Sequence, residues 1–90
     1  MEWKFTYAKG IPIEAQYLLK KAMELYSRGN AESALKYFQQ TLVIAPHYSR
    51  ALFEMGNCLV HLGQHEEAHA RFEQAIRIDP ALEELLTNRA

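Results

Sequence analysis

Apolar residues recur along this chain with the spacing of an α-helix, three or four positions apart. In the second half, Leu52, Met55 and Leu59 fall on one helical face. Gly63 then supplies a residue that tolerates a positive φ angle, and a second apolar face begins at Ala68. The pattern predicts two helices joined by a tight corner.

A step of 34 residues repeats this pattern in the first half of the chain. The three prolines, Pro12, Pro46 and Pro80, follow that spacing, and each closes a unit because proline cannot continue a helix. The same step connects further pairs of identical residues: Leu18 and Leu52, Leu25 and Leu59, Gly29 and Gly63, Glu32 and Glu66, Ala34 and Ala68, Phe38 and Phe72, Gln40 and Gln74, and Ile44 and Ile78. An internal repeat of this length indicates stacked helical units.

The stretch ALFEMGNCLVHLGQHEEAHARFEQAIRIDP resembles a tetratricopeptide repeat (TPR), a 34-residue helix-turn-helix unit. The matching residues are Leu52, Met55, Gly56, Leu59, Ala68, Phe72, Ala75 and Pro80. The first unit matches less closely, because Lys21 and Thr41 replace an apolar residue and an alanine. The resemblance implies an all-α fold in which TPR-type helix-turn-helix repeats form a short right-handed superhelical α-solenoid. Small residues such as Gly56 would let two helices approach closely.

We expect one compact domain with four segments: an N-terminal aromatic arm at 1–14, a first TPR at 15–48, a second TPR at 49–82 and a C-terminal capping helix at 83–90. Asp79 and Pro80 form a helix start, after which Leu82, Leu85 and Leu86 are expected on one packed side.

The arm carries Trp3, Phe5 and Tyr7, which alternate with polar residues as in a strand, although Trp3 and Tyr7 would also share a helical face. Three aromatic side chains on a short segment favour burial. They have three possible places: over the first repeat, in the protein's own groove, or in a second copy of the chain.

The stretch HEEAH at 65–69 fits the zinc-protease pattern H-E-x-x-H. Its Glu66 and Ala68 are repeat positions, however, and recur 34 residues earlier without any histidine. An extended zinc-protease pattern would place Gly and His where Phe72 and Ala75 stand. We therefore expect no enzyme, no catalytic residue and no cofactor.

We also expect no physiological metal site. His65 and His69, with His61 across the corner, make at most an opportunistic site, and the first two rings are expected to pack instead. The resemblance places a small packed residue at the position of Cys58, so we expect a buried, inert thiol there.

Composition excludes several other classes of function. The chain has 10 Lys+Arg against 11 Asp+Glu, with both signs scattered, so no basic stripe predicts nucleic-acid binding. No apolar run is long enough to cross a bilayer, and a single cysteine forms no disulfide framework. We expect a cytoplasmic protein without membrane insertion.

Packing inside the stack accounts for one apolar stripe on the first helix of each unit, and a second apolar stripe on the same helix remains unexplained by it. In proteins that resemble this one, the first helices line a concave face that holds an extended peptide or a helix. The peptide-binding groove would then consist of Gln16, Leu19, Met23, Tyr26, Ser27, Arg50, Phe53, Asn57, Val60 and His61. The alternative is that these residues pack against neighbouring helices or the chain's own ends.

The chemistry of this groove limits which classes of ligand it can bind. TPR domains that clamp a terminal carboxylate use Lys and Asn, and of that set only Asn57 matches here, because Leu19 and Met23 occupy the other places. We therefore predict a non-enzymatic protein-protein interaction module for an apolar or amphipathic peptide or helix. The alternative is a self-assembly module, a homodimer or stacked oligomer that uses the same apolar surface or the aromatic arm.

Overall fold

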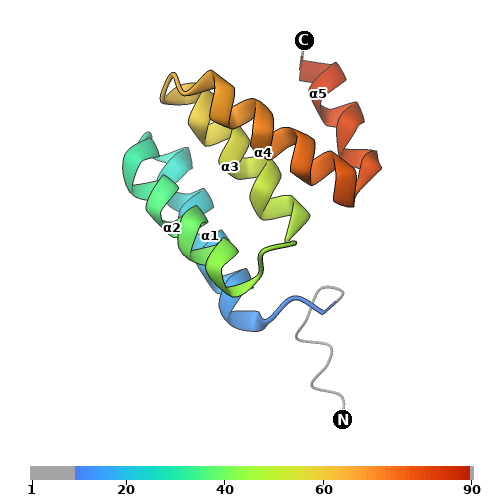
Figure 1. Ribbon diagram of the computed structural model, residues 1–90. Helices are drawn as coiled ribbons and strands as arrows, with labels where there is room; N and C mark the ends of the chain where they lie inside the picture. Colours follow the sequence, from blue (N-terminus) through green and yellow to red (C-terminus); the bar gives the residue numbers. More distant parts are fainter. Residues whose placement is uncertain (1–9, 90) are drawn as a thin grey trace.

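The computed structural model describes residues 10–89, and side chains as far as residue 86. Helices account for the elements in this range: α1 (Ile13–Ser27), α2 (Ala31–Ile44), α3 (Ser49–His61), α4 (His65–Ile78), the short 3-10 helix η2 (Pro80–Leu82) and α5 (Glu83–Arg89). Two helical hairpins, α1 with α2 and α3 with α4, lie side by side, and α5 follows the end of α4 (Figure 1). The predicted all-α helical repeat is confirmed. The aromatic side chains of the N-terminal arm lie outside the described residues.

The two hairpins turn at equivalent glycines. Gly29 and Gly63 have φ angles of +87° and +79°, a left-handed conformation that glycine adopts without a steric penalty. The backbone amide of the residue after each glycine donates a hydrogen bond to a carbonyl oxygen in the preceding helix. Asn30 N lies 2.9 Å from Leu25 O, and Gln64 N lies 2.9 Å from Leu59 O. The same turn therefore closes both units.

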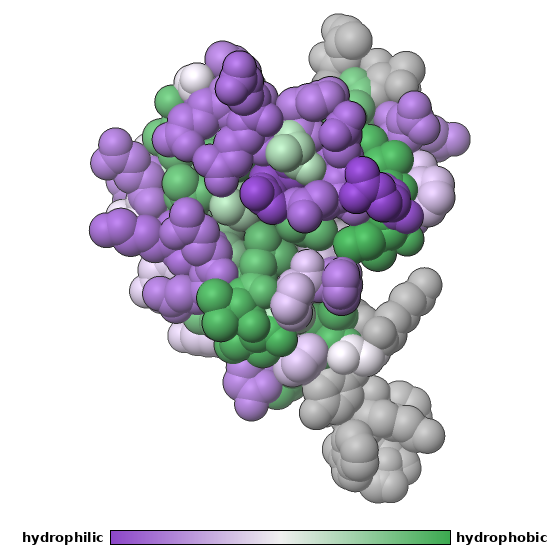
Figure 2. All heavy atoms as spheres, viewed as in Figure 1, coloured by the Kyte–Doolittle hydropathy of each residue, from purple (hydrophilic) through white to green (hydrophobic). Residues whose placement is uncertain are grey.

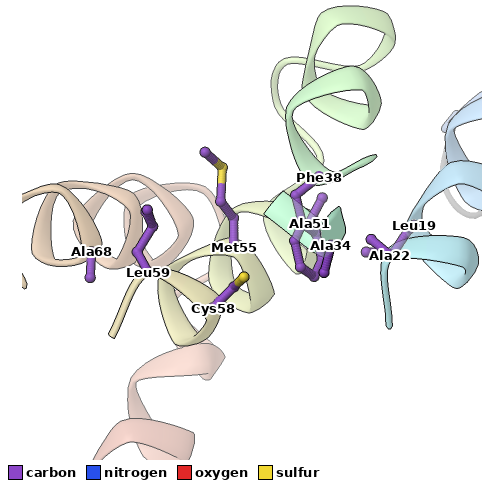
Figure 3. Close-up of a cluster of buried hydrophobic side chains, with 9 residues drawn as sticks. All are labelled: Leu19, Ala22, Ala34, Phe38, Ala51, Met55, Cys58, Leu59 and Ala68. Atoms are coloured by element: carbon purple, nitrogen blue, oxygen red, sulfur yellow. The ribbon is translucent and has the colours of Figure 1, made fainter. Parts of the chain in front are cut away.

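The core runs through all four long helices. Its buried residues are Leu19, Ala22, Ala34, Phe38, Ala51, Met55, Cys58, Leu59 and Ala68 (Figure 3). Close packing inside the second unit depends on Gly56, because a Cβ atom at this position would lie 2.6 Å from Cε1 of Phe72. The predicted close approach of the helices at Gly56 is confirmed.

A second buried cluster joins α3 and α4 to the C-terminal segment. Asp79 Oδ1 accepts a hydrogen bond from Ala81 N at 3.2 Å and so begins η2, as expected from the Asp-Pro pair. Leu82 and Leu86 pack against this cluster, whereas Leu85 is exposed. The expectation that all three leucines share one packed side was wrong for Leu85. The C-terminal segment begins with the 3-10 turn η2 before α5, and this turn changes the helical phase.

The outer surface of α2 and α4 faces the viewer in Figure 1. Figure 2 shows that this surface is largely hydrophilic, with hydrophobic groups near the C-terminal ends of the two helices. Val43, Ile44 and Ile78 are exposed there. Among residues 10–89, no helix combines the length and the apolar composition that crossing a membrane requires.

Candidate functional site

The ten residues of the predicted groove come from α1 and α3, and we call their surface the α1–α3 face. The structure brings the two helices together, but the ten side chains differ widely in exposure. Leu19, Phe53 and Asn57 are buried, and Gln16, Met23 and Tyr26 are partly buried. The side chains that remain exposed are Ser27, Arg50, Val60 and His61.

Phe53 has an exposed fraction of 0% and belongs to the second buried cluster. Its ring packs edge-on against Phe72, with 5.3 Å between the ring centroids. Leu82 and Leu86 pack against the same cluster. A ligand on the surface finds no accessible area on Phe53, so we leave this residue out of the contacts proposed below.

Tyr26, His61 and Asn57 form a polar junction between α1 and α3. The hydroxyl oxygen of Tyr26 lies 2.5 Å from Nδ1 of His61 and 3.3 Å from the carbonyl oxygen of Asn57. The two rings meet edge to face, with 5.1 Å between their centroids. This junction holds the last turn of α1 against the last turn of α3.

Glu54 was not among the residues predicted from the sequence. Its Oε2 accepts a hydrogen bond from Nε of Arg50 at 3.1 Å, and its Oε1 accepts one from Nδ2 of Asn57 at 3.2 Å. The spacing of four between Arg50 and Glu54 was a readable signal, because side chains one helical turn apart meet on the helix surface. The network orients Arg50 and Asn57 on the α1–α3 face.

A pocket of about 770 Å³ adjoins the junction at the corner end of the face. Its lining comes from the α1–α2 corner and from the C-terminal end of α3: Tyr26, Ser27, Gly29, Asn30, Ala31, Glu32, Ser33, His61 and Leu62. Only Tyr26, Ser27 and His61 belong to the predicted groove. The corner residues were missed because a helical stripe extends along one helix and does not reveal which loop lies beside it.

The opposite end of the face holds the chain that leads into α1. Nε2 of Gln16 donates a hydrogen bond to the carbonyl oxygen of Ile11 at 3.0 Å. Gly10, directly before this point, has a φ angle of +88°. The incoming backbone is therefore held beside a residue of the α1–α3 face.

The histidines of the HEEAH stretch do not pack as expected. His65 and His69 are exposed, and 74% of the His69 side chain is accessible, with Nε2 lying 3.1 Å from Oε2 of Glu73. The expectation failed because the outward side of α4 at these positions has no helix packed over it in the described part of the chain. Across residues 10–89, no group of three His, Cys, Asp or Glu side chains is arranged to hold a metal ion.

Cys58 lies in the core, as predicted, and its Sγ donates a hydrogen bond to the carbonyl oxygen of Ala31 at 3.1 Å. Burial raises the pKa of the Cys58 thiol, so less thiolate is present at any given pH. We expect a thiol-alkylating reagent at neutral pH to modify Cys58 about a hundredfold more slowly in the folded protein than in guanidinium-unfolded protein. Intact mass measured over time checks this, and equal rates in the two states would contradict it.

Comparison with known proteins is consistent with this arrangement of helices. A family model described as tetratricopeptide repeat matches residues 25–87. Tetratricopeptide repeat protein 6 of Homo sapiens is 32% identical over 83 residues, which cover 92% of this chain and 16% of the human protein. An uncharacterised protein of Methanocaldococcus jannaschii is 33% identical over 69 residues, which cover 77% of this chain and 80% of that protein.

Similarity also extends to a much longer enzyme. Protein adenylyltransferase Fic of Drosophila virilis is 33% identical over 87 residues, which cover 94% of this chain but 18% of the enzyme. This chain therefore spans less than a fifth of the human and Drosophila relatives.

Proposed function

Because the chain belongs to the tetratricopeptide repeat family, we propose that it binds an apolar or amphipathic peptide or helix of another protein on its α1–α3 face. Repeats of this family generally mediate protein-protein interaction. We further propose that the chain itself catalyses no reaction, since its similarity to the adenylyltransferase covers only 18% of the length of that enzyme.

The observation that carries this proposal is the exposure of the apolar side chain of Val60 on α3, next in the sequence to the polar junction residue His61. Val60 is 41% exposed on the last turns of α3, directly before His61. Met23 adds a partly buried and adaptable thioether side chain on α1. Apolar surface with polar groups at its rim is the usual composition of a small binding surface.

The polar groups of the face favour a segment with mixed chemistry. Arg50 is exposed, and its contact with Glu54 is made through Nε. Arginine presents further donors on its planar head group, so the terminal nitrogens suit a carbonyl or a carboxylate of the ligand. His61 and the pocket beside it supply polar contacts at the other end of α3. An amphipathic segment matches this distribution better than a purely apolar one.

The test uses two exposed valines. We expect Val60→Asp to weaken partner binding about tenfold or more, because a carboxylate replaces a side chain whose burial is worth ~1.5 kcal/mol. Val43→Asp is the matched control, since Val43 is 81% exposed on α2, outside the α1–α3 face. Proteins that are cross-linked to the tagged chain in cell lysate are quantified for the wild type and both variants, after circular dichroism has shown that all three fold. Equal losses in both variants, or none in either, would contradict the proposal.

A further inference from the structure

We propose that residues 1–9 of this chain, MEWKFTYAK, bind the α1–α3 face of the same molecule and compete with the partner for it. We call this segment the nonapeptide. The inference rests on the proposed function, because it assigns a regulator to the same surface.

The residues that directly follow the nonapeptide lie beside the face. Ile11 is held by the hydrogen bond from Gln16, which is itself a residue of the α1–α3 face. Gly10 has a left-handed φ angle of +88°, a backbone conformation typical of tight turns. The turn at Gly10 and the hydrogen bond at Ile11 therefore lie next to the face, and Gly10 is the residue that directly follows the nonapeptide in the sequence.

The side chains of the nonapeptide suit the chemistry of the face. Trp3, Phe5 and Tyr7 stand two positions apart, so an extended segment directs all three to one side. Aromatic side chains gain most from burial against apolar surface such as Val60 and Met23. Polar residues between the aromatics would face water. The nonapeptide thus has the amphipathic pattern expected of a ligand for this face.

Length and tethering favour binding within one molecule. Nine extended residues span up to ~30 Å, whereas the face along α1, from Gln16 to Ser27, is only about 17 Å long by the helical rise. A short tether gives an effective concentration on the order of 1 mM. A nonapeptide that binds in trans with a Kd of ~0.1 mM would therefore occupy the face about 90% of the time when attached. A second copy at micromolar concentration competes poorly with it.

Trp3 is the one tryptophan of the chain, so tryptophan emission reports on the nonapeptide directly. The experiment compares the full chain with a chain that lacks residues 1–9, and adds the synthetic peptide MEWKFTYAK to the shortened protein. We expect the emission of the peptide to move to shorter wavelength on binding, and the emission of the full chain to resemble that of the bound peptide. The matched control peptide carries Phe5→Ser and Tyr7→Ser and should not bind.

Two comparisons locate the binding site. Val60→Asp in the shortened protein should weaken peptide binding about tenfold, whereas Val43→Asp should leave it unchanged. A dansyl-labelled copy of the peptide, followed through its own fluorophore, should bind the full chain about tenfold more weakly than the shortened protein, because the attached nonapeptide competes.

The inference is overturned if the shortened protein does not bind the peptide, or if Trp3 of the full chain emits as in the free peptide. It is also overturned if light scattering shows that the full chain doubles its mass while the shortened protein stays monomeric, since the nonapeptide would then bind a second copy. The proposed function is judged separately by partner capture with the shortened protein. If the shortened protein captures no partner whose binding depends on Val60, the proposed function is contradicted. The tryptophan results are unaffected by that outcome.

Discussion

Phe53→Ala should lower the free energy of unfolding by about 3–5 kcal/mol, the usual cost of truncating a fully buried phenylalanine. Phe53 has no exposed surface, and its ring is packed edge-on against Phe72. Truncation would leave a cavity between α3, α4 and the C-terminal segment, where Leu82 and Leu86 also pack. Urea unfolding followed by far-UV circular dichroism measures the change in free energy.

The matched control for this substitution is Val60→Ala, seven residues later on the same helix. Val60 is substantially exposed, so its truncation should cost less than about 1 kcal/mol. If Phe53→Ala kept full stability and only weakened partner binding, Phe53 would be a ligand contact, as its place in the sequence stripe suggests, and its burial in the cluster would not matter for folding.

Phe38→Ala should cost a similar ~3–5 kcal/mol and should be more damaging than the same change at the equivalent position of the second unit, Phe72. Phe38 has no exposed surface and lies in the core shared by both hairpins, whereas Phe72 is only partly buried. A domain of this length has a total stability of roughly 5–13 kcal/mol. Phe38→Ala would therefore remove a large part of it.

Parallel urea unfolding of Phe38→Ala and Phe72→Ala tests the difference between the two positions. Gln39→Ala, on the exposed side of α2, serves as the control for a change that touches no core contact and should stay within ~0.5 kcal/mol of the wild type. Equal losses of free energy of unfolding at Phe38 and Phe72 would contradict the prediction that the deeper burial of Phe38 makes it the larger contributor to stability.

Much of the fold was predictable because it depends on local rules. The 34-residue step, the helical spacing of Leu52, Met55 and Leu59, and the position of Gly63 at a corner all follow from the chain itself. Helix geometry and the left-handed preference of glycine act within a few residues, so they need no knowledge of distant neighbours. Repetition of the pattern then identified which helices pair.

The sequence did not predict which residues of the proposed binding face are accessible, because exposure depends on neighbours from other elements. Phe53 and Val60 belong to the same sequence stripe, yet the first is covered by the cluster around Phe72 and the second is open. The resemblance implied packed side chains at His65 and His69, but both are exposed within the described range 10–89. A stripe of apolar residues cannot by itself tell which members will be covered.

Sequence alone thus determined the helical class, the repeat length and the glycine corners, since periodicity and backbone preference are properties of short segments. Tertiary structure alone decided the contact between Tyr26 and His61, the pocket beside it, and which apolar residues on α3 remain accessible. The physical reason is that packing angles between helices place side chains from distant parts of the chain in contact, and these angles are set by the fit of all the surfaces together.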